Sequence, residues 1–96
     1  MKMVLIIYSG RDPRIVTDLL DQYGAGGYTA LERGRGVGTT GRREGTRAWP
    51  GDATLVFSVV PPEQAADLEA ALRAAAAGLA PGERLHAAVL PIETFF

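Results

Sequence analysis

The segment ATLVFSVV at residues 53–60, followed directly by Pro61-Pro62-Glu63, decides the fold of this chain. An apolar run of this length, rich in β-branched residues, predicts a buried strand. Proline followed by an acidic residue is typical of the first positions of a helix. The sequence therefore predicts a strand that leads straight into a helix. The apolar face of that helix consists of Ala65, Leu68, Leu72 and Ala76, and Gly78 ends it.

A similar strand and helix form the start of the chain. Met3 to Tyr8 (MVLIIY) predicts a strand that is buried on both faces. Asp12 is expected to cap the next helix, with Pro13 at its first position and Gly24 as its left-handed end. The apolar face of this helix consists of Ile15, Val16, Leu19, Leu20 and Tyr23.

Two further segments are predicted to be edge strands. After a turn at Gly26-Gly27, residues 28–38 (YTALERGRGVG) predict an edge strand, because glycines and arginines suit a central strand poorly. Residues 39–51 (TTGRREGTRAWPG) have no apolar periodicity and predict a loop. His86 to Ile92 (HAAVLPI) predicts the fourth strand, in which Pro91 indicates an edge or a strand end.

The element order βαββαβ predicts a single α+β domain of the ferredoxin-like type over residues 1–96. In this fold a four-stranded antiparallel sheet carries both helices on one face, because the crossovers are right-handed. Two helices cover only one face of the sheet, so the sequence predicts a homo-oligomer in which another subunit covers the second face. The apolar strand residues behind this expectation include Val4, Ile6, Leu55, Phe57 and Val59.

The composition is that of an ordinary globular protein, with 47% hydrophobic and 22% charged residues. The start of the chain lacks the features of a signal peptide and there is no cysteine, so we expect a protein of the reducing cytoplasm.

His86 lies in an apolar segment and is interpreted as a structural histidine with a hydrogen-bond partner, not as a metal ligand. No spacing of residues suggests a nucleophile with its base, so neither a metal site nor an enzyme is expected. The residues considered were Ser9, Thr29, Glu32, Glu44 and Asp52.

The charge is distributed unevenly along the chain. Residues 1–50 contain eight Lys or Arg and five Asp or Glu, whereas residues 51–96 contain two and six. Five arginines and a single acidic residue, Glu44, lie between Arg33 and Arg47. Such a segment is either a solvated edge and loop or a site for an anion or an acidic partner; we favour the site, because guanidinium groups bind phosphate and carboxylate bidentately. The glycines between these arginines are compatible with a bulged edge strand as well.

Several short motifs together resemble the PII signalling superfamily, especially its members with a short loop. They are Gly27-Tyr28-Thr29, the run GRGVG at 34–38, a loop that ends in Trp49-Pro50-Gly51, and Pro62-Glu63-Gln64. The resemblance implies a homotrimer with inward-facing sheets. It further implies a small anionic effector between subunits, most often an adenine nucleotide such as AMP, ADP, ATP or a cyclic nucleotide, with no covalently bound cofactor. The loop after the second strand, called the T-loop in this family, would contact a membrane transporter or an enzyme.

The resemblance also assigns site residues by position. Those expected to bind the ligand are Gly27, Thr29, Arg33, Arg35, Gly36, Val37, Gly38 and Arg84. Those expected in the partner-binding loop are Arg42, Arg43, Arg47 and Trp49. The glycine pair at the base of the loop is either Gly34 and Gly36 or Gly36 and Gly38. Trp49 is interpreted as a loop anchor, the alternative being a ring that stacks on adenine or faces the partner.

The sequence departs from the nitrogen-regulating members in two places. They carry a Gly-Asp-Gly-Lys phosphate loop before the last strand, where this chain has Pro81-Gly82-Glu83-Arg84, and only Arg84 replaces the lysine charge. Their C-terminal phosphate-binding arginines have no counterpart before Phe96, so triphosphate binding does not carry over. The loop contains no tyrosine for the modification known in the family.

A ferredoxin-like binding module without nucleotide signalling, either amino-acid-sensing or nucleic-acid-binding, is the alternative. RNA readers of this shape stack bases on exposed aromatic residues of the sheet. The strands offer Tyr8 and Phe57 for this purpose, without interleaved basic residues. Nucleic acid is therefore not an expected partner.

Overall fold

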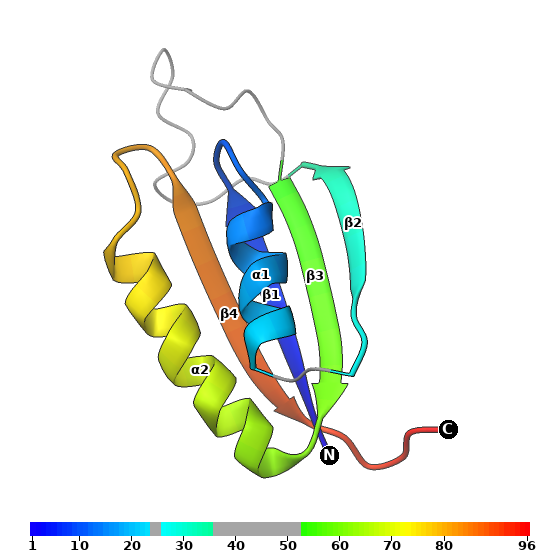
Figure 1. Ribbon diagram of the computed structural model, residues 1–96. Coiled ribbons are helices and arrows are strands. Elements are labelled where there is room, and N and C mark those ends of the chain that lie inside the picture. The colour runs from blue at the N-terminus through cyan, green and yellow to red at the C-terminus, as the bar shows by residue number, and fades with distance from the viewer. Residues whose placement is uncertain (24–25, 36–52) are drawn as a thin grey trace.

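A computed structural model describes residues 1–23, 26–35 and 53–96 of the chain. The elements are β1 (Lys2–Ser9), α1 (Arg14–Gln22), β2 (Thr29–Gly34), β3 (Ala53–Val60), α2 (Pro62–Ala77) and β4 (Arg84–Pro91). The four strands form one antiparallel sheet in the order β2-β3-β1-β4, and both helices lie on the same face of it (Figure 1). The predicted ferredoxin-like βαββαβ fold is confirmed, with β2 and β4 at the edges.

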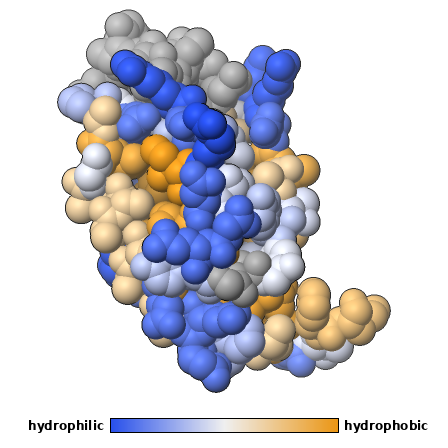
Figure 2. Space-filling view, viewed as in Figure 1, coloured by the Kyte–Doolittle hydropathy of each residue, from blue (hydrophilic) through white to orange (hydrophobic). Residues whose placement is uncertain are grey.

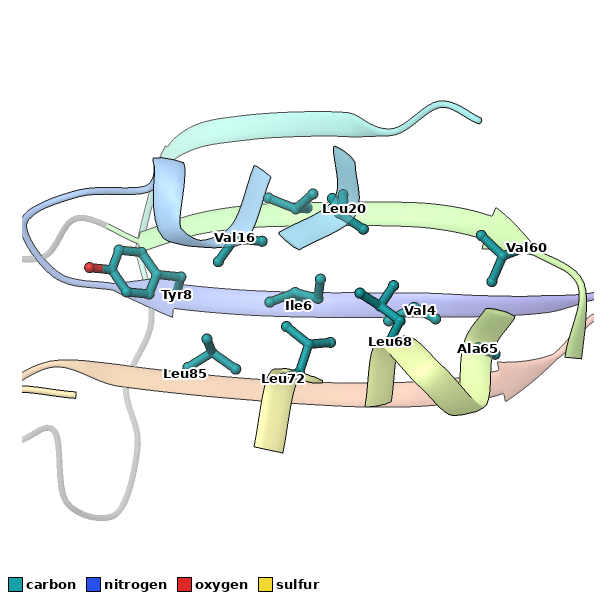
Figure 3. Packing of buried hydrophobic residues seen from close by; sticks show 11 residues of the cluster. Val4, Ile6, Tyr8, Val16, Leu20, Val60, Ala65, Leu68, Leu72 and Leu85 are labelled. Atoms are coloured by element: carbon teal, nitrogen blue, oxygen red, sulfur yellow. The ribbon is translucent and has the colours of Figure 1, made fainter. Parts of the chain in front are cut away.

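The hydrophobic core lies between the helices and one face of the sheet. The register places Ile6 of β1 opposite Val56 of β3 and Ala87 of β4, so side chains at alternate positions point to the helices. Figure 3 shows these side chains between the sheet and the two helices. The buried residues are Val4, Ile6, Tyr8, Val16, Leu20, Val56, Val60, Ala65, Leu68, Leu72 and Leu85. Figure 2 shows the outer surface of α1 as a hydrophilic strip, as expected for a helix with one buried face.

The helix ends differ slightly from the sequence prediction. Pro13, not Asp12, occupies the N-cap position of α1, and Asp12 Oδ1 accepts a hydrogen bond of 3.1 Å from the backbone N–H of Arg14. Tyr23 follows the end of α1 and is 37% exposed, so its predicted place in the core is wrong. In α2 the predicted face is confirmed: Ala65, Leu68 and Leu72 are buried and Ala76 packs against them.

The edge strand β2 is irregular, as its sequence suggests. Its pairing with β3 is interrupted between Leu31 and Gly34, and Arg33 adopts a positive φ of 65°. A β-bulge that strengthens the local twist explains this break. Residues 36–38 of the predicted strand lie outside the described residues. At the other end of β2, the buried Ser58 hydroxyl donates a hydrogen bond of 2.5 Å to the carbonyl of Gly27.

The face of the sheet opposite the helices is apolar and uncovered in a single chain. The prediction that β1 is buried on both faces is therefore wrong for one chain, because burial alternates along it and Ile7 is 44% exposed. Leu31 of β2 and Leu90 of β4 are exposed to a similar extent. We call this side the open face, and the register places on it Met3, Leu5, Ile7, Leu31, Leu55, Phe57, Val59, Ala88 and Leu90, together with Thr29 and His86.

No helix within the described ranges is both long enough and apolar enough to cross a membrane.

We expect Leu68→Ala to lower the free energy of unfolding by about 2–5 kcal/mol, because it leaves a cavity between α2 and the sheet. The neighbouring exposed Asp67→Ala is the matched control, with an expected change within about 0.5 kcal/mol. Urea unfolding at equal protein concentration measures both. Equal midpoints for the two variants would contradict the assigned core.

Candidate functional site

Two turns meet at one end of the sheet. This end, which we call the loop end, is formed by Ser9, Gly34, Ala53 and Arg84. Residues 10–13 connect β1 to α1 here, and residues 80–83 lead into β4. Strand β2 ends and strand β3 begins at this end as well, since Gly34 is paired with Ala53. Three connections of the fold therefore converge on one small region.

Glu83 joins the two turns through hydrogen bonds from three donors. Its Oε2 accepts one from the Tyr8 hydroxyl at 3.1 Å and one from the backbone N–H of Arg11 at 3.1 Å. Its Oε1 accepts one from the backbone N–H of Ala80 at 3.1 Å. The N–H groups of Arg11 and Ala80, followed by the Tyr8 hydroxyl, hold the pKa of Glu83 below its ordinary value. The Glu83 carboxylate is therefore ionised at neutral pH and holds the two turns together.

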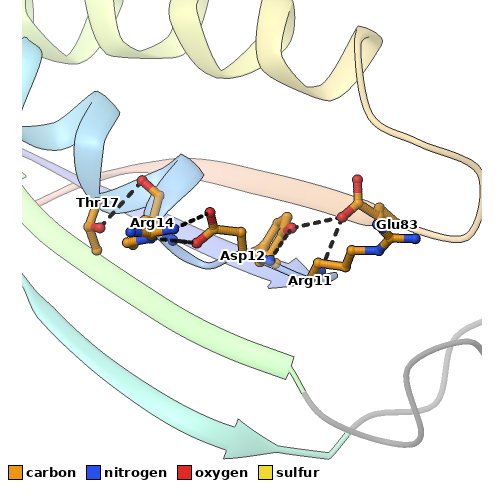
Figure 4. A network of polar contacts seen from close by, with 6 residues as sticks. Arg11, Asp12, Arg14, Thr17 and Glu83 are labelled. Atoms are coloured by element: carbon orange, nitrogen blue, oxygen red, sulfur yellow. Dashed lines mark hydrogen bonds and ion pairs between the residues drawn. The ribbon is translucent and has the colours of Figure 1, made fainter.

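Tyr8 ties this clamp to the hydrophobic core. Its ring is buried, and its hydroxyl accepts a hydrogen bond of 3.2 Å from the backbone N–H of Asp12 while donating to Glu83 (Figure 4). Burial is the main cause that raises the pKa of the Tyr8 hydroxyl, and the nearby charges of Glu83 and Asp12 raise it as well. The hydrogen bond from the Asp12 N–H partly offsets this rise. The hydroxyl stays protonated at neutral pH and remains a donor. We call Tyr8, Glu83 and the N–H groups they bind the Tyr8–Glu83 node.

Gly10 is required by the tight packing of this node. A Cβ atom at position 10 would overlap the Tyr8 hydroxyl and lie 2.6 Å from Glu83 Oε2. Any larger residue would push apart the two groups that hold the turns together. Gly82, in the second turn, has a φ of 90°, which also favours glycine.

Positive charge accumulates around the node. Arg84 follows Glu83 and pairs with Ser9 at the end of β1, and Arg33 lies at the bulge of β2. Arg14 forms an ion pair of 2.9 Å with Asp12, which lowers the pKa of the Asp12 carboxyl. The cations described at the loop end are Arg11, Arg14, Arg33, Arg35 and Arg84, and the carboxylates are Asp12, Glu32 and Glu83. This excess of guanidinium groups suits an anionic ligand.

Two hollows adjoin the sheet. The smaller, of about 190 Å³, lies at the loop end and is lined by Tyr8, Gly10, Pro13, Glu32, Arg33 and Thr54. The larger, of about 340 Å³, lies between α2 and β4, where Arg73 is engaged by Glu69 at 2.9 Å. We place the candidate site at the loop end, because the predicted arginines are located there and not in the larger groove.

The predicted ligand-binding residues fall into two groups. Arg33, Arg35 and Arg84 lie at the loop end. Thr29 lies on the open face opposite Phe57, and Gly27 precedes it. Along β3, Phe57 and Ala53 are four residues apart, or roughly 13 Å at the usual rise of a strand. The two groups therefore do not meet within one chain. A Cβ at Gly27 would meet nothing within 4 Å, so the packing of the single chain does not require this glycine.

The remaining predictions for the site concern residues outside the described ranges. They are Gly24 as the helix end, Gly36, Val37 and Gly38 as ligand-binding residues, and Arg42, Arg43, Arg47 and Trp49 as the partner-binding loop.

The structure corrects two interpretations of strand residues. His86 is exposed, and its imidazole makes no hydrogen bond to another described residue, so it is not a structural histidine with a side-chain partner. Tyr8 points into the core and not onto the open face, so it is unavailable for stacking on a base. Within residues 1–23, 26–35 and 53–96, no group of three or more His, Asp or Glu is placed to hold a metal ion.

Sequence reasoning missed the Tyr8–Glu83 node altogether. Tyr8 and Glu83 are 75 positions apart, and neither has a spacing that points to the other. The only available signals were Gly10-Arg11 directly after a strong strand and a glycine turn before Arg84. Arg11 was likewise missed, because it lies outside the arginine-rich segment.

We expect the stability contributed by Glu83 to depend on pH. Since the pKa of Glu83 is lowered by folding, its contribution is present above its ordinary value of 4.5 and is lost as the pH falls through the folded-state value. The wild type should therefore be more stable than Glu83→Gln at pH 7, and the gap should narrow from pH 4.5 downward. Thermal unfolding between pH 7 and pH 3 measures this gap.

Glu63→Gln removes a negative charge from an exposed position away from the node and corrects for the general loss of one charge. A gap between wild type and Glu83→Gln that stays constant down to pH 3 would show that the carboxylate is not clamped as described.

Comparisons with known proteins agree with this geometry. The chain matches solved structures of CPII, a nitrogen regulatory PII-like protein from Thiomonas intermedia K12. One, bound to ADP and bicarbonate, is 24% identical with a TM-score of 0.68, over 97% of this chain and 88% of CPII. Another, bound to ADP, AMP and bicarbonate, is 21% identical with a TM-score of 0.66, over 99% and 94%.

TTHA0516 from Thermus thermophilus, a protein assigned to PII-like signaling, is 25% identical with a TM-score of 0.65, over 92% of this chain and 82% of its own. No curated protein matches the sequence. The model of the family "Nitrogen regulatory protein P-II" matches residues 1–83. The match covers most of the sheet, both helices and the Tyr8–Glu83 node. This chain therefore belongs to the nitrogen regulatory protein P-II family.

Proposed function

We propose that this protein is a homotrimeric PII-like regulator that binds a small anionic effector, an adenine nucleotide, between its subunits. The observation that carries the proposal is the guanidinium cluster at the loop end. It is supported by the family relative CPII, whose structure has been solved with ADP and AMP bound. The loop at residues 39–51 would contact a protein partner in the cytoplasm, either a membrane transporter or an enzyme. Its role is regulatory and not catalytic.

The open face supports the oligomer. It presents aliphatic and aromatic side chains over all four strands, and both helices lie on the opposite side. An apolar surface of this extent is stable in water when a second copy covers it. Closed cyclic assemblies are the common way for copies of one chain to do so.

The separation of the two groups of site residues supports a ligand position between subunits. Thr29 and Gly27 lie about 13 Å along the sheet from the loop end that carries Arg33 and Arg84. In a ligand position between subunits, the Thr29 end of one chain and the loop end of another could both contact the ligand. Binding would then favour one arrangement of the 39–51 loop, provided that the effector interacts differently with the two loop states.

We expect light scattering to give a mass of about three times the 10.2 kDa of one chain. Ile7→Glu places a charge in the centre of the open face, where burial of an unpaired charge is costly, and should reduce the mass toward one chain. Tyr23→Glu changes a comparably exposed apolar residue after α1 and should leave the mass unchanged. A wild type that is monomeric at high concentration would contradict the trimer and favour a sheet face free to bind nucleic acid.

We expect isothermal titration calorimetry to detect binding of at least one of AMP, ADP, ATP and cyclic AMP. Arg84→Ala should weaken that binding by about tenfold or more, because charge-assisted hydrogen bonds contribute about 1.5–3 kcal/mol. Arg73→Ala, in the exposed ion pair on α2, is the matched control and should bind like the wild type. No heat with any of the four nucleotides would exclude the nucleotide as effector.

A further inference from the structure

We propose that Phe95 and Phe96 of one subunit insert into the groove between α2 and β4 of the neighbouring subunit. The inference rests on the homotrimer of the proposed function, and it adds a contact between subunits that the open face does not supply. The occupant of the groove is a second copy of this chain, and the groups recognised are two aromatic rings.

Residues 92–96 carry two aromatic rings that have no cover in a single chain. Figure 2 shows this segment as a hydrophobic projection that stands clear of the body of the molecule. Phe95 is 65% exposed, and Phe96 is fully exposed. Single exposed apolar residues are common on protein surfaces, but two adjacent phenylalanines on a projecting segment form an apolar patch of the kind that marks a contact.

The groove between α2 and β4 has a shape and a lining that suit an aromatic ring. Its apolar walls are formed by Leu72 and Ala76 of α2 and by Leu85, Ala87 and Val89 of β4. Ala87 and Val89 lie on the side of the sheet that faces the helices, yet both remain exposed, because α2 does not cover this edge. The volume of about 340 Å³ lies within the range of roughly 300–1,000 Å³ in which proteins bind small apolar groups. The groove is therefore large enough for a phenylalanine side chain.

The 92–96 segment points away from the groove of its own chain. The backbone N–H of Ile92 donates a hydrogen bond of 3.3 Å to the carbonyl of Met1, so the segment begins beside β1, on the inner side of β4. From there it runs toward the side of the sheet that carries β2, whereas α2 lies on the other side (Figure 1). A neighbouring chain is thus better placed than the chain itself to accept Phe95 and Phe96.

The positions of the segment and the groove match the symmetry of a closed ring. In such a ring each chain contacts the next through two different surfaces. The strand order places β2 and β4 at opposite edges of the sheet, so the segment and the groove lie on opposite sides of one chain. Each chain can therefore give its segment to one neighbour and its groove to the other.

The area of this contact indicates that it supplements the open face. Two phenylalanine side chains bury roughly 300–500 Å² in total. A stable interface buries about 800 Å² on each partner. The inserted rings therefore strengthen an assembly that the open face also holds together, and their loss should weaken the trimer without abolishing it.

Sedimentation equilibrium of the full chain over a range of concentrations tests the proposal. We expect the double variant Phe95→Ser, Phe96→Ser to raise the concentration of half-dissociation by about tenfold or more, because it removes the buried rings. Ala87→Glu places a carboxylate in the groove and should have a similar effect. All three changes together should cause little further dissociation, because either alteration alone already prevents the contact. Thr94→Ala, on the same segment, is the matched control and should dissociate like the wild type.

Three outcomes would overturn the inference while the trimer itself stands. The first is a phenylalanine variant that dissociates like the wild type. The second is additive effects of the segment and groove changes, which would place the rings on a different surface. The third is a lower thermal midpoint without a change in dissociation, which would place the rings in the groove of their own chain. If the wild type is a monomer at every concentration, the proposed trimer fails, and this inference fails with it.

Discussion

Two helices on one side of a four-stranded sheet leave the other side without cover, and the organisation of this protein follows from that constraint. In β1 the residues facing the helices are fully buried, whereas Ile7 on the other face remains exposed. An ordinary antiparallel sheet of this kind would have a polar outer face. Here the outer face is apolar as well, which is the property expected of a surface that packs against another copy.

The same topology brings the chemistry of the chain to one end of the sheet. Antiparallel pairing of β1 with β3 and β4 places Ser9, Ala53 and Arg84 side by side. The connections that carry most of the positive charge begin or end there. Residues 10–13 and 80–83, two of the connections at this end, contribute no residue to the buried core, and loops on a rigid scaffold commonly serve binding.

The Tyr8–Glu83 node links these connections to the core. A buried aromatic ring supplies a hydroxyl at the end of β1, and one carboxylate uses it to fix two turns from distant parts of the chain. Such a clamp is useful where a ligand must find guanidinium groups already in position. In the Pro81-Gly82-Glu83-Arg84 turn, Glu83 holds the turn through the N–H of Ala80, and Arg84 adds a positive charge next to it.

The sequence by itself determined the element order, the two core-forming strands, the face of α2 and the edge position of β2, because hydrophobic periodicity and turn residues act locally. It also predicted Arg33, Arg35 and Arg84 for the candidate site, and the structure places all three at the loop end. Only the tertiary structure decided that Tyr8 points to the helices, that His86 is exposed, and that the backbone N–H of Arg11 is bound by Glu83. These facts depend on strand register and on contacts across 72 to 75 positions, which no local pattern records.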